Sequence, residues 1–70
     1  MSKGYYLTQI EKLSTDSQYD ARLTIYLLKA VLKMAKEDHY LELEDYCEVS
    51  DTAYVEIDAL TVQIMNLPRR

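Results

Sequence analysis

The longest regular pattern of apolar residues predicts a helix over residues 16–38. Thr15 and Gln18 fit a capping box at its start, in which each side chain satisfies a backbone N–H of the other residue. At about 100° per residue, one main apolar face forms. That face contains Tyr19, Leu23, Tyr26, Leu27, Ala30, Val31 and Met34. Further apolar residues widen it to more than twice the roughly 100° arc of an ordinary surface helix. We therefore expect this helix to be covered on several sides.

A second helix is predicted over residues 51–66. Ser50 can accept a hydrogen bond from a backbone N–H of its first turn, Asp51 is favourable at the positive end of the helix dipole, and Pro68 ends it. Its inward residues include Ile57, Leu60 and Ile64.

Two weaker patterns predict short helices over residues 3–13 and 41–48. The second one also alternates as a strand would, and it could instead continue the long helix. Between Gly4 and Pro68 there is no glycine or proline, which disfavours the tight turns of an all-β fold. We expect one all-α domain over residues 1–70, a small bundle of three or four helices at about 3–13, 16–38, 41–48 and 51–66.

Helices this short and few do not cover the long apolar helix, because bundles bury each helix against two or three neighbours. We therefore expect a homodimer. The residues expected in the core or the dimer are those of the main face of 16–38 together with Ile57, Leu60 and Ile64.

The stretch "EVSDTAYVEIDAL" at residues 48–60 has the pattern of a helix-turn-helix, with its turn at 48–50. Glu48 stands where such a turn commonly carries glycine. Residues 40–67 contain seven acids and no lysine or arginine, which disfavours DNA binding because affinity for DNA comes largely from cations. The stretch fits a capped helix start, or a similar shape that docks on protein.

The acids are concentrated in the second half of a chain whose net charge is −4. An acidic surface with tyrosines suits recognition of a basic protein surface. The expected binding residues are Glu42, Glu44, Asp45, Tyr46, Glu48, Asp51, Tyr54, Glu56 and Asp58. We expect a small acidic regulatory or inhibitory protein, such as an antirepressor or a blocker of a nucleic-acid-binding protein. The alternatives are a helix-turn-helix-like DNA-binding regulator and a structural assembly subunit.

No arrangement of catalytic residues, metal ligands or cofactor-binding residues is recognisable. His39 and Cys47 supply two candidate ligands, whereas a zinc site needs about four. A basic ridge of Arg22, Lys29, Lys33 and Lys36 on the long helix fits a solvated surface better than a nucleic-acid contact. We expect a cytoplasmic protein that is not an enzyme and has no cofactor and no membrane segment.

Overall fold

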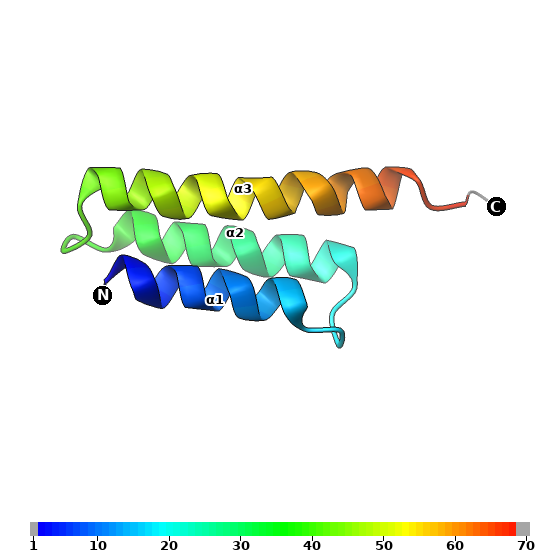
Figure 1. Ribbon diagram of the computed structural model, residues 1–70, viewed down its shortest axis with the longest axis horizontal. Coiled ribbons are helices and arrows are strands. Elements are labelled where there is room, and N and C mark those ends of the chain that lie inside the picture. The colour runs from blue at the N-terminus through cyan, green and yellow to red at the C-terminus, as the bar shows by residue number, and fades with distance from the viewer. Residues whose placement is uncertain (1, 69–70) are drawn as a thin grey trace.

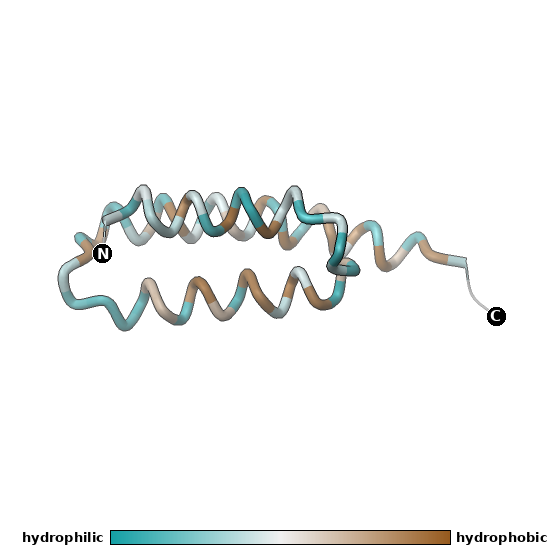
Figure 2. The backbone as a smooth tube through the Cα atoms, turned by 90° about the horizontal axis from the view of Figure 1, so that it is seen from below, coloured by the Kyte–Doolittle hydropathy of each residue, from teal (hydrophilic) through white to brown (hydrophobic). Residues whose placement is uncertain are grey.

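Three helices run alternately up and down in the computed structural model, which describes residues 2–68. They are α1 (Lys3–Thr15), α2 (Ala21–Glu37) and α3 (Leu43–Met65), and each contacts both of the others. α1 and α3 lie on one side and α2 on the other (Figure 1 and Figure 2). The end of α3 extends beyond its two neighbours, which contributes to a length of 47 Å (Figure 1). The prediction of an all-α helical bundle is confirmed.

The predicted boundary between helices 41–48 and 51–66 is wrong, because α3 is continuous from Leu43 to Met65. Val49 is fully buried within it, and the hydroxyl of Thr52 donates to the backbone carbonyl of Glu48 at 2.9 Å. No non-glycine residue among residues 2–68 has the positive φ of a left-handed turn. The physical reason is a single apolar stripe at four-residue spacing, Val49, Ala53 and Ile57, which crosses the supposed turn and packs best as one straight helix.

The long helix begins later than predicted, at Ala21. Asp20 is its N-cap, and its carboxylate accepts a hydrogen bond from the backbone N–H of Leu23 at 2.8 Å. The predicted capping box does not form, because the hydroxyl of Thr15 donates to the backbone carbonyl of Glu11 in the last turn of α1. α1 therefore continues to Thr15, and residues 16–20 connect the two helices.

The core lies along the axis of the bundle and takes side chains from all three helices. Its apolar members are Tyr6, Ile10, Leu28, Leu32, Ala35, Val49, Ala53 and Ile57. α2 turns Thr24, Leu28, Leu32 and Ala35 inward, and this face is adjacent to the one expected from the sequence. A helical wheel with two neighbouring apolar faces does not say which of them meets the other helices.

The residues predicted for the core or the dimer consequently divide into three groups. Ile57 is buried. Partly buried are Tyr19, Leu27, Val31, Leu60 and Ile64. Exposed are Leu23, Tyr26, Ala30 and Met34, which all lie on α2.

Candidate protein-binding surface

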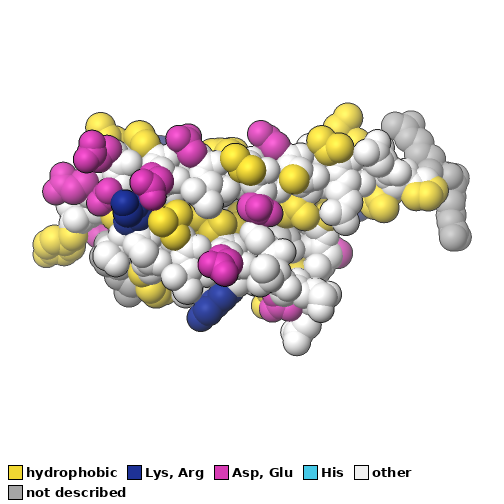
Figure 3. Space-filling view, in the orientation of Figure 1, with side chains coloured by type: hydrophobic (Ala, Val, Ile, Leu, Met, Phe, Trp, Pro, Cys, Tyr) yellow, Lys and Arg dark blue, Asp and Glu magenta, His cyan; other side chains and the backbone are white. Residues whose placement is uncertain are grey.

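Four acids share the outward side of α3. Glu44, Glu48, Asp51 and Asp58 are exposed and are separated by four, three and seven residues, so they lie on one face of a helix. We call these four residues the acidic face. Acidic side chains gather over the first half of α3 in the space-filling view (Figure 3). Exposed Val55 lies between Asp51 and Asp58 in the sequence and adds apolar surface to the same helix.

The other predicted binding residues lie elsewhere around α3. Glu42 precedes the helix as its N-cap and is exposed. Tyr46 packs against the core, whereas Tyr54 is about half exposed, at 49%. Asp45 and Glu56 are partly buried. The nine predicted residues therefore do not form a single face.

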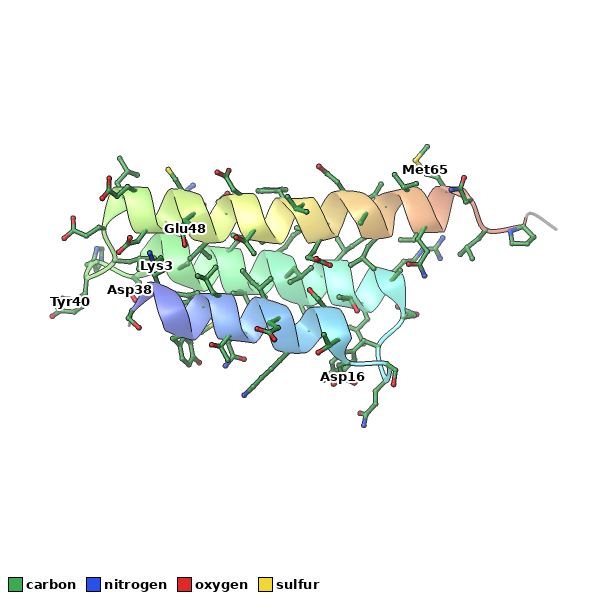
Figure 4. All side chains as sticks on the ribbon, in the orientation of Figure 1. Lys3, Asp16, Asp38, Tyr40, Glu48 and Met65 are labelled. Carbon is green, nitrogen blue, oxygen red and sulfur yellow. The ribbon has the colours of Figure 1, made fainter. Side chains whose placement is uncertain are left out.

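Within residues 2–68, Lys3 of α1 is the cation that pairs with acids of this region. Its ammonium nitrogen lies 3.4 Å from Glu48 Oε1 and 3.8 Å from Asp45 Oδ1. Lys3 and Glu48 lie at the same end of the bundle as Asp38 and Tyr40 (Figure 4). Exposed ion pairs of this kind contribute about 0–1 kcal/mol and are screened by salt. Lys3 thus offsets the charge at one end of the acidic face only.

An open groove runs between α1 and α3. Its lining residues are Leu7, Ile10, Glu11, Ser14, Thr15, Thr52 and Glu56, around a volume of about 460 Å³. Leucine and isoleucine supply its apolar surface, and each helix contributes one glutamate. We call this feature the α1–α3 groove. The sequence predicted Glu56 as a binding residue but not Glu11, because only the packing of the helices brings the two glutamates to one groove.

Tyr6 connects α1 to the start of the α2–α3 connection. It is buried, with 4% of its surface exposed, and its hydroxyl donates to Asp38 Oδ2 at 2.7 Å. The backbone N–H of Tyr40 donates to the other carboxylate oxygen at 3.0 Å. The hydrogen bond to Asp38, together with burial, raises the pKa of Tyr6 to about 12. Hydrogen bonding to the amino terminus, followed by the hydrogen bonds from Tyr6 and the backbone of Tyr40, lowers the pKa of Asp38 to about 2.

Changing Tyr6 to phenylalanine is expected to reduce the loss of stability at alkaline pH. A folded-state pKa of about 12, above the ordinary 10.0, means that Tyr6 contributes stability that is full below pH 10 and is lost as the pH rises toward 12. Urea unfolding at pH 9, 10 and 11 should show a steeper fall for the wild-type chain than for Tyr6→Phe. Equal slopes for the two proteins would show that Tyr6 does not couple to folding.

The cations of the predicted basic ridge lie on a different helix from the acids. Arg22, Lys29, Lys33 and Lys36 are all exposed on α2. α2 lies on the other side of the bundle from the α1–α3 pair (Figure 2), so these four cations and the acids of α3 belong to different sides of the molecule.

Two further features of residues 2–68 bear on the sequence predictions. No three histidine, cysteine, aspartate or glutamate side chains come together there as a potential metal site. None of the three helices in this part of the chain combines the length and apolar character needed to cross a membrane. His39 and Cys47 are both exposed.

No known protein family, curated protein or solved structure matches this chain.

Proposed function

We propose that this chain is a small non-enzymatic regulatory protein whose acidic face binds a basic surface of another protein. The observation that carries the proposal is the charge of α3, which has six acids and no lysine or arginine over its 23 residues. Four of these acids are exposed on one side, and Lys3 reaches only the end near Glu48. A surface of this kind attracts a cationic partner over a distance and suppresses binding to anionic ones.

Proteins that bind DNA or RNA present basic surfaces of this type. An acidic protein that occupies such a surface prevents the nucleic acid from binding there, because both ligands need the same cations. An antirepressor or a blocker of a nucleic-acid-binding protein is therefore the concrete form of the proposal. The α1–α3 groove, with Glu11 and Glu56 beside its apolar surface, would hold apolar side chains of the partner next to its cations.

The continuous α3 disfavours the alternative of a helix-turn-helix regulator. The expected turn at 48–50 lies within α3, so no separate reading helix begins at residue 51. The exposed side of α3 is acidic, and phosphates would be repelled by it. A mobility-shift titration at low salt addresses the remaining alternative, DNA binding through the basic ridge, which would weaken steeply as salt is added.

Neutralising the acidic face is expected to weaken partner capture at least about tenfold, which corresponds to about 1.4 kcal/mol. The variant is Glu44→Gln/Asp51→Asn/Asp58→Asn, which leaves Glu48 and its ion pair with Lys3 intact. A partner would first be identified by affinity capture from a native lysate and mass spectrometry, and its affinity for the purified variants would then be measured by calorimetry.

The matched control is Thr8→Lys/Ser17→Lys/Gln18→Lys. It changes the net charge by the same three units at exposed positions on α1 and the α1–α2 connection. We expect this control to bind as the wild-type chain does. Equal weakening in both variants would mean that net charge alone matters, and full binding by the neutralised variant would exclude the acidic face as the site.

We also propose that the protein works as a homodimer. The support comes from α2, where Leu23, Tyr26 and Met34 are 42%, 70% and 53% exposed although they belong to an otherwise packed bundle. A structural assembly subunit would use the same apolar surface to form larger oligomers. Sedimentation velocity separates the two possibilities, because the proposed regulator sediments as a closed dimer.

A further inference from the structure

We infer that the α1–α3 groove binds an arginine side chain of the partner protein. The inference rests on the proposed function and deepens it, because it names the type of residue that the groove recognises. It starts from the polar side chains that line the groove, which are those of Glu11, Ser14, Thr15, Thr52 and Glu56. No lysine or arginine of residues 2–68 is among the lining residues. The lining of the groove is therefore negative.

The three hydroxyl groups of the groove already donate their protons within the chain. Each donates to the backbone carbonyl four residues earlier in its own helix, at 2.8 Å for Ser14, 3.0 Å for Thr15 and 2.9 Å for Thr52. A hydroxyl group has one proton to donate, and its oxygen has two lone pairs that can accept. Toward a ligand in the groove, these three oxygens can therefore only accept hydrogen bonds.

The two glutamates of the groove are acceptors as well, because an ionised carboxylate has no proton to donate. Glu11 comes from α1 and Glu56 from α3, so both helices supply a carboxylate. The ion pairs of residues 2–68 join Lys3 to Asp45 and Glu48, and they leave the two groove glutamates without a cation from this part of the chain. All five polar side chains of the groove thus offer acceptors and no donor.

Arginine is the side chain that matches such a set of acceptors. Its guanidinium group is always charged and has five N–H donors and no acceptor. It is planar, so it can form two parallel hydrogen bonds to one carboxylate. It is also more weakly hydrated than the ammonium group of lysine, which favours its transfer into a partly apolar groove. A phosphate group would be repelled by the same lining.

The apolar part of the groove fits the stem of the same side chain. Leu7 is partly buried and lines the groove beside Ile10. Long cationic side chains bury their methylene groups along apolar surface and keep the charged end among polar groups. From Leu7 to Thr15 the groove follows α1 for about 12 Å, at 1.5 Å per residue. Its volume of about 460 Å³ leaves room for an apolar residue next to the arginine. The occupant is therefore an arginine beside an apolar residue of the partner.

Blocked dipeptides test this inference on the wild-type chain. The probes are acetyl-Leu-Arg amide, acetyl-Leu-Lys amide and acetyl-Leu-citrulline amide, each titrated into isotope-labelled protein and followed by NMR. Citrulline has nearly the shape of arginine and no charge. The arginine peptide should shift the signals of Leu7, Glu11 and Thr52. It should bind at least about fivefold more tightly than the citrulline peptide, because charge-assisted hydrogen bonds are roughly twice as strong as neutral ones.

The lysine peptide should bind roughly twofold or more weakly than the arginine peptide, because an ammonium group cannot form the paired hydrogen bonds. Equal or tighter binding of the lysine peptide would overturn the assignment to arginine. Equal binding of the arginine and citrulline peptides, shifts confined to residues outside the groove, or no shifts at all would overturn the inference as a whole.

The variant Glu11→Gln/Glu56→Gln tests the two carboxylates. It should bind the arginine peptide at least about fivefold more weakly than the wild-type chain, because glutamine keeps the size of glutamate and loses its charge. The matched control, Ser17→Lys/Gln18→Lys, changes the net charge by the same two units at exposed positions that do not line the groove. The control should bind the arginine peptide as the wild-type chain does. Equal weakening in both variants would overturn the site, and if Glu11→Gln/Glu56→Gln does not fold, the peptide comparison on the wild-type chain decides alone.

Failure of the groove is distinguishable from failure of the acidic face. The acidic face is tested by partner capture with Glu44→Gln/Asp51→Asn/Asp58→Asn, and none of these three residues lines the groove. If the arginine peptide does not bind while that variant loses partner capture, the groove inference is overturned and the proposed function stands. If the peptide binds in the groove while the variant captures the partner fully, the acidic face is excluded and the groove inference stands.

Discussion

Replacing Asp51 by proline is expected to destabilise this protein by about 3 kcal/mol or more, because residue 51 lies in the interior of a continuous helix. Proline has no N–H to donate to the carbonyl of Cys47, one turn earlier, and its ring collides with that carbonyl. Asp51 is exposed, so the substitution removes no core packing. For a domain of this size, the melting temperature should fall by more than about 10 °C. Thermal unfolding followed by circular dichroism measures the effect.

Two controls make this experiment decisive. Leu43→Pro changes the first residue of the same helix, after Glu42 in the extended conformation, and proline is tolerated at that position. We expect Leu43→Pro to change the stability little, since the Leu43 side chain is 77% exposed and makes little core packing that could be lost. Asp51→Ala isolates the loss of the carboxylate. If a helix instead began after Ser50, Asp51 would be its first residue and Asp51→Pro would be harmless. That outcome would restore the helix-turn-helix interpretation.

Shortening Leu28 to alanine is expected to lower the free energy of unfolding by about 2–5 kcal/mol. Leu28 is fully buried at the centre of α2, and its loss leaves a cavity among side chains from α1 and α3. A 70-residue domain has a total stability of roughly 5 kcal/mol. Leu28→Ala should therefore keep at most about 3 kcal/mol of its stability, and almost none at the upper end of the expected cost. Urea unfolding at low protein concentration, which disfavours the proposed dimer, measures the change in the free energy of unfolding.

The matched control is Leu23→Ala on the same helix. Leu23 is 42% exposed in the single chain, so the same chemical change should cost less than about 1 kcal/mol in dilute solution. At high concentration, Leu23→Ala should weaken the proposed dimer instead. If Leu23→Ala destabilised the chain in dilute solution as much as Leu28→Ala does, α2 would be packed into the core through the face that contains Leu23, as the sequence predicted.

The acidic surface was predictable in part. The absence of lysine and arginine from residues 40–67 is visible in the sequence, and a helix places Glu44, Glu48 and Asp51 on one side wherever that helix sits in the fold. Lys3 and Glu11 could not be assigned to this surface, since they are distant in sequence and belong to α1. The contact between Tyr6 and Asp38, 32 residues apart, was equally invisible.

The amino-acid sequence by itself determined that the protein is helical and that its charge is segregated, because both follow from local spacing and composition. Tertiary structure decided the rest. Local capping preferences allowed a helix to begin at Ser50, but burial of Val49, Ala53 and Ile57 in one stripe stabilises the continuous helix more than a cap would. Both apolar faces of α2 have helical periodicity, and only the shapes of α1 and α3 select Leu28 over Leu23 for the core. Periodicity reports which residues can be buried, whereas the neighbouring helices determine which of them are.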